Sequence, residues 1–221
     1  MWIDDIDIEQ LVTAYGKLKP INALSVGVIL NLDLSQTIHE VLADVKDENI
    51  LENFVACDIK KMHVYLMPLL CNEHRIAESW SIHIPIDISY DEIKAIISSY
   101  YHESFSEQPY RLKFKNVSIL RNKLCIKMES ADLETSHTLS ALKDFTLNTL
   151  GFRMLDLEPF EIRIHLGLWT IKNIKNFSLE IEDLRSRLTE RYSQSIGIME
   201  LDGAKILEHS DLFDLKELKI T

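Results

Sequence analysis

The chain has 221 residues, of which 46% are hydrophobic, and this length suits one large or two small globular domains. Its 35 acidic residues outnumber its 24 basic residues and give a formal net charge of −11. A surface this acidic excludes wrapping around long nucleic acid, which needs a basic face, but it allows a local basic pocket for a small phosphate group.

Cysteine content and hydropathy predict the compartment. The three cysteines, Cys57, Cys71 and Cys125, are odd in number and lack the spacing of metal-binding pairs, so we expect reduced thiols in a cytoplasmic protein. The first residues, MWIDDIDIEQ, are acidic rather than apolar, which argues against a secretory signal peptide. No apolar run approaches the roughly 18 residues that a membrane span requires, so no membrane partner is expected.

Apolar residues at helical spacing open the chain, and a glycine follows them. This pattern predicts a short helix that ends at Gly16, within an N-terminal helical extension over residues 1–21. Period-two alternation then predicts a strand over 24–34, and Ser35 is the expected N-cap of the next helix. Two further segments are expected to be extended, namely residues 54–70 and 79–88.

The second half of the sequence has clear start and turn signals. Ser89 and Glu92 have the spacing of a capping box, which predicts the start of a helix that runs to about residue 101. Two alternating segments that flank a short polar turn predict a hairpin over 110–129. The later expected elements are helices over 132–150 and 177–192 and a closing hairpin whose turn is Asp202-Gly203.

The predicted elements form a mixture of helices and strands that is typical of an α+β fold. The chain has only 6 glycines and 5 prolines, and no low-complexity linker divides it. We therefore expect residues 1–221 to form a single domain.

Two predicted strands carry a histidine near their centre. They are KKMHVYLMP, with His63, and EIRIHLGLW, with His165. Side chains alternate between the two faces of a strand, so the residues that share each histidine's face can be read from the sequence. His63 shares its face with Lys61 and Tyr65, and His165 shares its face with Arg163, Gly167 and Trp169.

The opposite face of the second strand is a continuous aliphatic row, which is expected to pack under helices. The histidine faces are therefore expected to look outward, into a groove or solvent. Two histidines across a groove can act as an acid–base pair, because unperturbed imidazole titrates near pH 6.5. Phosphodiester chemistry also needs cations for the developing charge, and alternation places Lys61, Lys127 and Arg163 where they can supply it.

The order of elements and the two histidine strands resemble the two-histidine phosphoesterase superfamily over about residues 22–216. MHVYLMPLL and FEIRIHLGLW are similar to the strands that carry the family's motif, a histidine followed two positions later by threonine or serine. The resemblance implies two pseudo-symmetric α/β lobes whose antiparallel sheets line a central cleft. It also implies catalysis by His63 and His165, without metal or cofactor, on 2′,3′-cyclic phosphates, 2′,5′-linked oligonucleotides or RNA ends. In the family the motif hydroxyls hold the phosphate oxygens, whereas this chain has Tyr65 and Gly167 at those positions.

Two functions are compatible with these residues. In the first, the protein is a metal-independent phosphodiesterase for a small nucleotide or an RNA end. Tyr65, Arg163 and Lys127 then stabilise the phosphate, Gly167 offers its backbone and open space, and Trp169 stacks a base. In the second, the protein is an inactive module that binds nucleotides or other proteins, because the motif hydroxyls are missing. Pairing with Glu161 is an equal alternative for Arg163, and core packing is favoured over stacking for Trp169.

Of the other histidines, His83 is expected to be structural or exposed, and the rest are expected to lie at the surface. Cys71 and His74 are close in sequence, but a zinc site needs about four ligands, so no metal site is expected. These remaining histidines are His39, His74, His83, His102, His137 and His209.

Overall fold

The chain folds into helices and strands in a computed structural model that describes residues 8–13, 17–43, 53–78, 80–101, 104–153, 161–170 and 178–218. The α-helices are α1 (Ile8–Leu11), α2 (Leu32–Ala43), α3 (Tyr90–Tyr100), α4 (Ser104–Glu107), α5 (Leu133–Asp144) and α7 (Ser178–Ser195). The strands are β1 (Ala23–Ile29), β2 (Phe54–Ala56), β3 (His63–Cys71), β4 (Tyr110–Leu120), β5 (Lys123–Ser130), β6 (Arg163–Trp169), β7 (Ile198–Leu201), β8 (Lys205–His209) and β9 (Leu215–Glu217).

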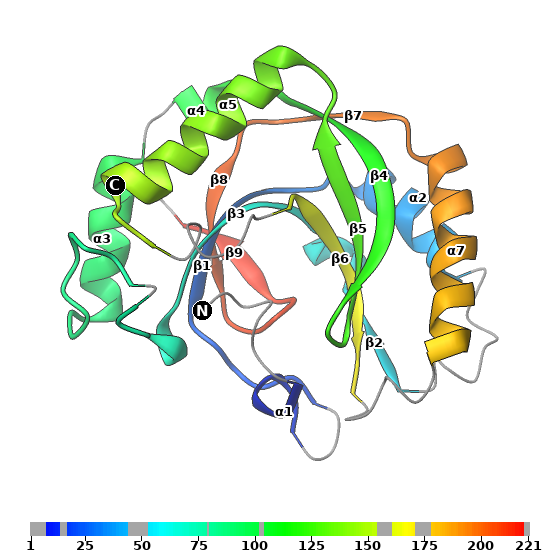
Figure 1. Ribbon diagram of the computed structural model, residues 1–221, viewed down its shortest axis with the longest axis horizontal. Coiled ribbons are helices and arrows are strands. Elements are labelled where there is room, and N and C mark those ends of the chain that lie inside the picture. Colours follow the sequence, from blue (N-terminus) through cyan, green and yellow to red (C-terminus); the bar gives the residue numbers. More distant parts are fainter. Residues whose placement is uncertain are drawn as a thin grey trace.

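These strands form one antiparallel sheet, in the order β7-β4-β5-β6-β3-β1-β8-β9, with β2 pairing with β6. The contact between β6 and β3 divides this order into two four-stranded halves. The sheet curls around the centre of the molecule, with α3, α4 and α5 outside one half and α2 and α7 outside the other (Figure 1). The predicted α+β fold with two antiparallel halves is confirmed.

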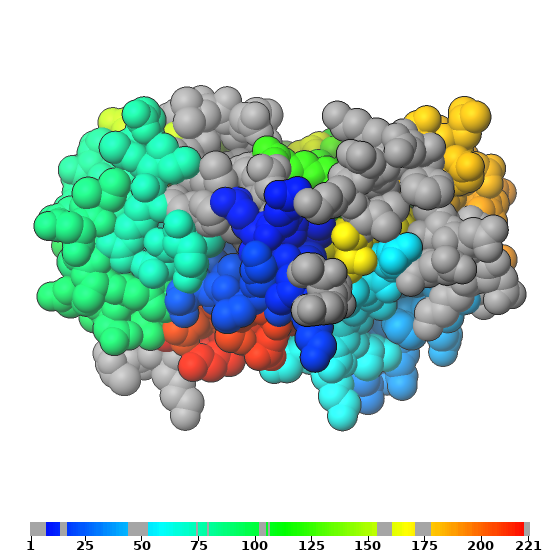
Figure 2. All heavy atoms as spheres, turned by 90° about the horizontal axis from the view of Figure 1, so that it is seen from below, coloured from blue at the N-terminus to red at the C-terminus, as the bar shows by residue number. Residues whose placement is uncertain are grey.

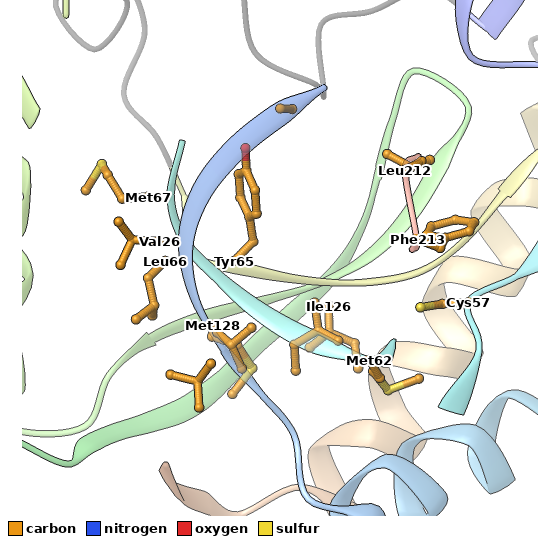
Figure 3. Packing of buried hydrophobic residues seen from close by; sticks show 14 of the residues in the cluster. Val26, Cys57, Met62, Tyr65, Leu66, Met67, Ile126, Met128, Leu212 and Phe213 are labelled. Carbon is orange, nitrogen blue, oxygen red and sulfur yellow. The ribbon is translucent and has the colours of Figure 1, made fainter. Parts of the chain in front are cut away.

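The aliphatic faces of the two central strands form the middle of the core. Val64, Leu66, Ile164 and Leu166 are fully buried, as the alternation predicts. Figure 3 shows buried side chains on both sides of the sheet, with those of Met62, Ile126 and Met128 on the side of the helices and that of Tyr65 on the opposite side. Burial of each such aliphatic side chain contributes roughly 1.5–3 kcal/mol, so these rows hold the central strands in register.

Helix starts follow local capping, with one correction. Ser89 and Glu92 form the predicted capping box at the start of α3. The helix α2, however, begins at Leu32, before the expected cap Ser35, which is buried inside the helix. The side chain of Asn31 accepts a hydrogen bond from the backbone of Leu34, so it takes the capping role.

The expected extended segment over 79–88 is wrong. Its described residues, from 80 onward, contain no strand, although Ser81 forms an isolated bridge with Phe152. The guanidinium of Arg75 lies over the ring of Trp80 and donates hydrogen bonds to the backbone carbonyls of Ile86 and Ile88. A side chain therefore satisfies backbone groups that a sheet partner would otherwise pair, and the alternation in SIHIP does not make a strand.

The predicted closing hairpin around Asp202-Gly203 is also wrong. β7 pairs with β4 and β8 pairs with β1, so residues 202–204 carry the chain from one half of the sheet to the other. β8 forms its hairpin with β9 instead, through a turn in which the carboxylate of Asp211 accepts hydrogen bonds from the backbone of Phe213 and Asp214. An Asp-Gly pair is a local turn signal and does not determine which strand pairs with which.

The three cysteines are free and buried. Burial, together with the nearby carboxylates of Asp58 and Asp211, raises the pKa of Cys57 to about 12. Within the part of the chain that the structure describes, no helix combines the length and apolar character needed to cross a bilayer.

The packing of β6 gives a stability prediction. Ile164 is 0% exposed at the centre of the sheet, so Ile164→Ala is expected to destabilise the protein by about 2–5 kcal/mol in urea unfolding. Ile198 also lies on a strand but is 53% exposed, and Ile198→Ala is the matched control with an expected loss below about 1 kcal/mol. Equal losses in the two variants would contradict the placement of β6 in the core.

Candidate active site

The pairing of β3 with β6 brings the two motif histidines together. The register pairs Val64 with Ile164 and Tyr65 with Arg163, so His63 lies opposite His165 one step further along. The centroids of the two imidazole rings are 6.4 Å apart. Because these two strands are the central strands of the sheet, the histidines meet where its two halves join.

Two further side chains complete a group that we call the ring cluster, consisting of His63, Tyr65, His165 and His209. The ring of Tyr65 lies 5.8 Å from that of His165, and the ring of His209 lies 5.5 Å from that of His63 and 6.2 Å from that of Tyr65. His209 is the last residue of β8 and was expected at the surface, which is wrong because it is 2% exposed. The sequence feature that could have indicated this burial is the segment KILEH, in which His209 ends a partly apolar strand.

A backbone hydrogen bond orients the ring of His63. Its Nδ1 lies 3.1 Å from the carbonyl oxygen of Lys61, which belongs to the short 3-10 turn between β2 and β3. A carbonyl oxygen can only accept, so Nδ1 carries the hydrogen and Nε2 is the basic nitrogen of the neutral ring. The ammonium of Lys61 lies 2.9 Å from the Asp214 carboxylate and also donates to the carbonyl of Leu215. Lys61 thus anchors the turn to the β8–β9 connection.

The ring cluster is closed to solvent, so the expectation that the histidine faces look outward is wrong. All four side chains are only 2% exposed. Figure 2 shows the N-terminal residues, in dark blue, between the two halves of the molecule, and the backbone N–H of Ile21 donates to the carbonyl of Ser210. The buried side chains of Leu212 and Phe213 lie on the Tyr65 side of the sheet (Figure 3). Alternation shows which side chains share a face, but it does not show what covers that face.

Arg163 and Lys127 lie beside the cluster and are engaged by Glu161. The Nε of Arg163 donates to the backbone carbonyl of Glu161 at 3.0 Å, whereas the Glu161 carboxylate forms ion pairs with Lys127 and Lys115. Partial burial opposes ionisation of this carboxyl, but the hydrogen bond and charge of Lys127 outweigh it and hold the pKa of Glu161 below its usual value. The predicted cations are therefore near the site, with a carboxylate among them.

Gly167 and Trp169 are covered by β2. The register pairs Phe54 with Trp169 and Ala56 with Gly167, and the rings of Phe54 and Trp169 have centroids 4.9 Å apart. A Cβ atom at Gly167 would lie 2.4 Å from the Phe54 ring and 2.5 Å from the Val55 carbonyl oxygen. The expected open space at Gly167 is therefore filled, and Trp169, which is fully buried, packs in the core.

No group of three or more histidine, cysteine, aspartate or glutamate residues among the described residues is arranged to hold a metal ion.

Solved structures match the fold of this chain, whereas the comparisons of its sequence found nothing. No family model matches the sequence, and no curated protein matches it. A conserved protein of unknown function from Agrobacterium tumefaciens is similar over 96% of this chain and 90% of its own, with 14% identity and a TM-score of 0.72. LigT of Escherichia coli in its apo form is similar over 91% of this chain and 96% of its own, with 11% identity and a TM-score of 0.52. The complex of that LigT with 3′-AMP is similar over 90% and 96%, with 10% identity and a TM-score of 0.52.

The chain has the fold of the two-histidine phosphoesterases. This confirms, for the fold, the resemblance that the element order and the histidine strands indicated. His63 and His165 both lie on the central strands of this fold, and the residues two positions after them are a buried phenol, Tyr65, and a covered glycine, Gly167.

The covering of Gly167 generates a prediction about the missing hydroxyl. Gly167→Ser, which recreates the motif residue, is expected to destabilise the protein by about 1–3 kcal/mol, because its Cβ would overlap Phe54 and Val55. Gly197→Ser is the control, since nothing lies within 4 Å of a Cβ at that position. Urea unfolding of both variants checks this prediction, and a Gly167→Ser protein as stable as the wild type would contradict it.

The carboxylate of Glu161 gives a pH dependence. Its pKa is lower in the folded protein than the usual value of 4.5, so its stabilising contribution is present at pH values above about 4.5 and is lost as the pH falls through the folded value. Glu161→Gln is expected to lower the free energy of unfolding at pH 7 by less than about 1 kcal/mol, since the pair is partly exposed.

This difference from the wild type is expected to shrink when urea unfolding is repeated near pH 3 to 4. Glu190→Gln, at an exposed position of α7, is the control and is expected to show no comparable loss at pH 7. A Glu161→Gln deficit that grows in acid would have the wrong sign.

Proposed function

We propose that the protein is a metal-independent phosphodiesterase that acts on a small nucleotide or an RNA-end phosphodiester, through acid–base chemistry by His63 and His165. The observation that supports this most directly is the convergence of the two imidazoles, 6.4 Å apart, at the junction of the two halves of the sheet. A phosphodiester and its attacking water between two such rings can accept a hydrogen bond from one imidazole and donate one to the other.

The orientation of His63 suggests how the two roles are divided. Its basic Nε2 takes a proton from the attacking water, and that water's oxygen forms a new bond to phosphorus. His165, in its protonated form, donates a proton to the ribose oxygen as the bond between phosphorus and that oxygen breaks. Each turnover consumes one water and leaves a phosphomonoester, and proton exchange with solvent restores both rings.

The proposed substrate class is small because of charge and size. The net charge of −11 disfavours long polyanions. The complex of the Escherichia coli LigT with 3′-AMP is an example of a nucleotide of this size in a protein of the same fold. Arg163 and Lys127 lie on the strands next to the rings and are the cations that we assign to the phosphate.

The closed ring cluster favours a second candidate, an inactive module that keeps the fold and binds a nucleotide or a protein. Rings that are 2% exposed cannot touch a substrate unless the covering segments move. Phe54 also occupies the place beside Gly167 where the family has a hydroxyl. The two candidates differ in one measurable property, which is turnover.

Turnover assays test the proposal with 2′,3′-cyclic nucleotides, 2′,5′-linked oligoadenylate and RNA with a 2′,3′-cyclic end, in the presence of EDTA. We expect hydrolysis of at least one of these by the wild type. His63→Ala and His165→Ala are each expected to lower kcat by about 100-fold or more, because each removes a proton-transfer group.

His137→Ala is the matched control, because this histidine is exposed on α5. It should leave the rate unchanged. Wild-type binding of a nucleotide without hydrolysis would favour the inactive module, and equal rates in all four proteins would contradict the proposed mechanism.

A further inference from the structure

The ring cluster contains a third imidazole, which neither motif strand supplies. His209 comes from β8, which is separated from β3 by β1 in the sheet. Its ring nevertheless lies 5.5 Å from that of His63 and 6.2 Å from that of Tyr65, so it packs against two members of the ring cluster. Both strands belong to the curled sheet (Figure 1), and the rings lie close together although β8 and β3 are not neighbours in it.

A buried hydrogen bond holds His209 in this position. Its Nε2 lies 2.8 Å from the hydroxyl of Ser25 on β1, and neither side chain is more than 2% exposed. A hydrogen bond between two buried side chains keeps a fixed geometry, because water does not compete for either partner. Because Ser25 engages Nε2, a hydrogen bond from His209 to a ligand would use Nδ1.

His209 also borders a pocket of about 410 Å³ at the end of β8 and β9. The pocket contains two lysines, and each has a carboxylate partner there, with Lys61 2.9 Å from Asp214 and Lys216 3.1 Å from Glu208. The charges in the pocket therefore balance, which favours a phosphoester of low charge over a polyphosphate. Of the four members of the ring cluster, His209 is the one that lines this pocket.

We propose that His209 is a phosphate-binding residue of the site and that Ser25 is its positioning residue. The Nδ1–H of His209 donates to a non-bridging oxygen of a phosphoester that approaches from the pocket, while the phenol of Tyr65 donates to the same group. These two donors bind the phosphate oxygens in place of the motif hydroxyls, which the chain lacks. The inference rests on the proposed function, since it assigns a binding role within the same site.

Two measurements on the full chain test this assignment. Titration with inorganic phosphate, followed by the imidazole C–H signals in NMR spectra, gives a Kd, and steady-state kinetics gives KM and kcat separately. His209→Ala is expected to raise both the phosphate Kd and KM about 10-fold or more, because one donor to an anion is lost. Its kcat is expected to fall less than that of His63→Ala.

Conservative variants separate binding from folding. His209→Gln keeps an N–H donor and is expected to recover part of the phosphate affinity that His209→Ala loses. Ser25→Ala is expected to raise the phosphate Kd by a smaller factor and to change how that Kd depends on pH, because the ring loses its fixed partner. If His209→Ala does not fold, these two variants decide the outcome, and His137→Ala is the control that should match the wild type.

The outcomes distinguish this inference from the proposed function. A wild type that binds phosphate in a His209-dependent manner, but hydrolyses nothing, would contradict the phosphodiesterase and support the phosphate-binding role. Hydrolysis that requires His63 and His165, with wild-type phosphate Kd and KM in the His209 and Ser25 variants, would overturn the role of His209 alone. A protein that neither binds phosphate nor hydrolyses a phosphodiester would overturn both.

Discussion

The short antiparallel contact between β3 and β6 is the constraint on which the rest of the structure depends. It joins the two four-stranded halves of the sheet, and its register sets His63 opposite His165. The contact is short because the rest of the same edge of β6 pairs with β2. Residues 57–62 connect β2 to β3. His63 begins β3 directly after this loop and bonds to a carbonyl within it, so the geometry of the site depends on where the interruption falls.

The same interruption accounts for the glycine in the second motif. Because β2 pairs with the end of β6, the ring of Phe54 and the backbone of Val55 lie against Gly167, at distances that exclude even a Cβ atom. Packing therefore requires glycine at this position, and this requirement accounts for the absence of a side-chain hydroxyl there. The aromatic pair of Phe54 and Trp169 seals that end of the strand. Donors that replace this hydroxyl are therefore expected at the other end of the cluster, where Tyr65 and His209 lie.

Much of this could be predicted from the sequence where the signal is local. The capping box at Ser89 and the aliphatic row on β6 follow from spacing alone, and alternation put Arg163 and His165 on one face. His209 was missed because its place depends on the pairing of β8 with β1, and its hydrogen bond to Ser25 spans 184 residues. The turn at Asp202-Gly203 was misread for the same reason, since a local turn signal carries no information on distant partners. Burial of the histidine face likewise depends on segments far away in the chain.

Charge balance around the cluster determines how a phosphate could be held there. The ammonium of Lys127 has the Glu161 carboxylate beside it, and Lys61 has Asp214, so neither contributes a large excess of positive charge. In a chain of net charge −11, attraction of an anion from a distance is weak. Besides the charge of Arg163, affinity then depends on donors in fixed geometry, such as imidazole N–H groups and a phenol, whose hydrogen bonds are stronger when water is excluded. The ring cluster is closed to water. The burial that hides the histidines from solvent would therefore also strengthen their hydrogen bonds to a small phosphoester.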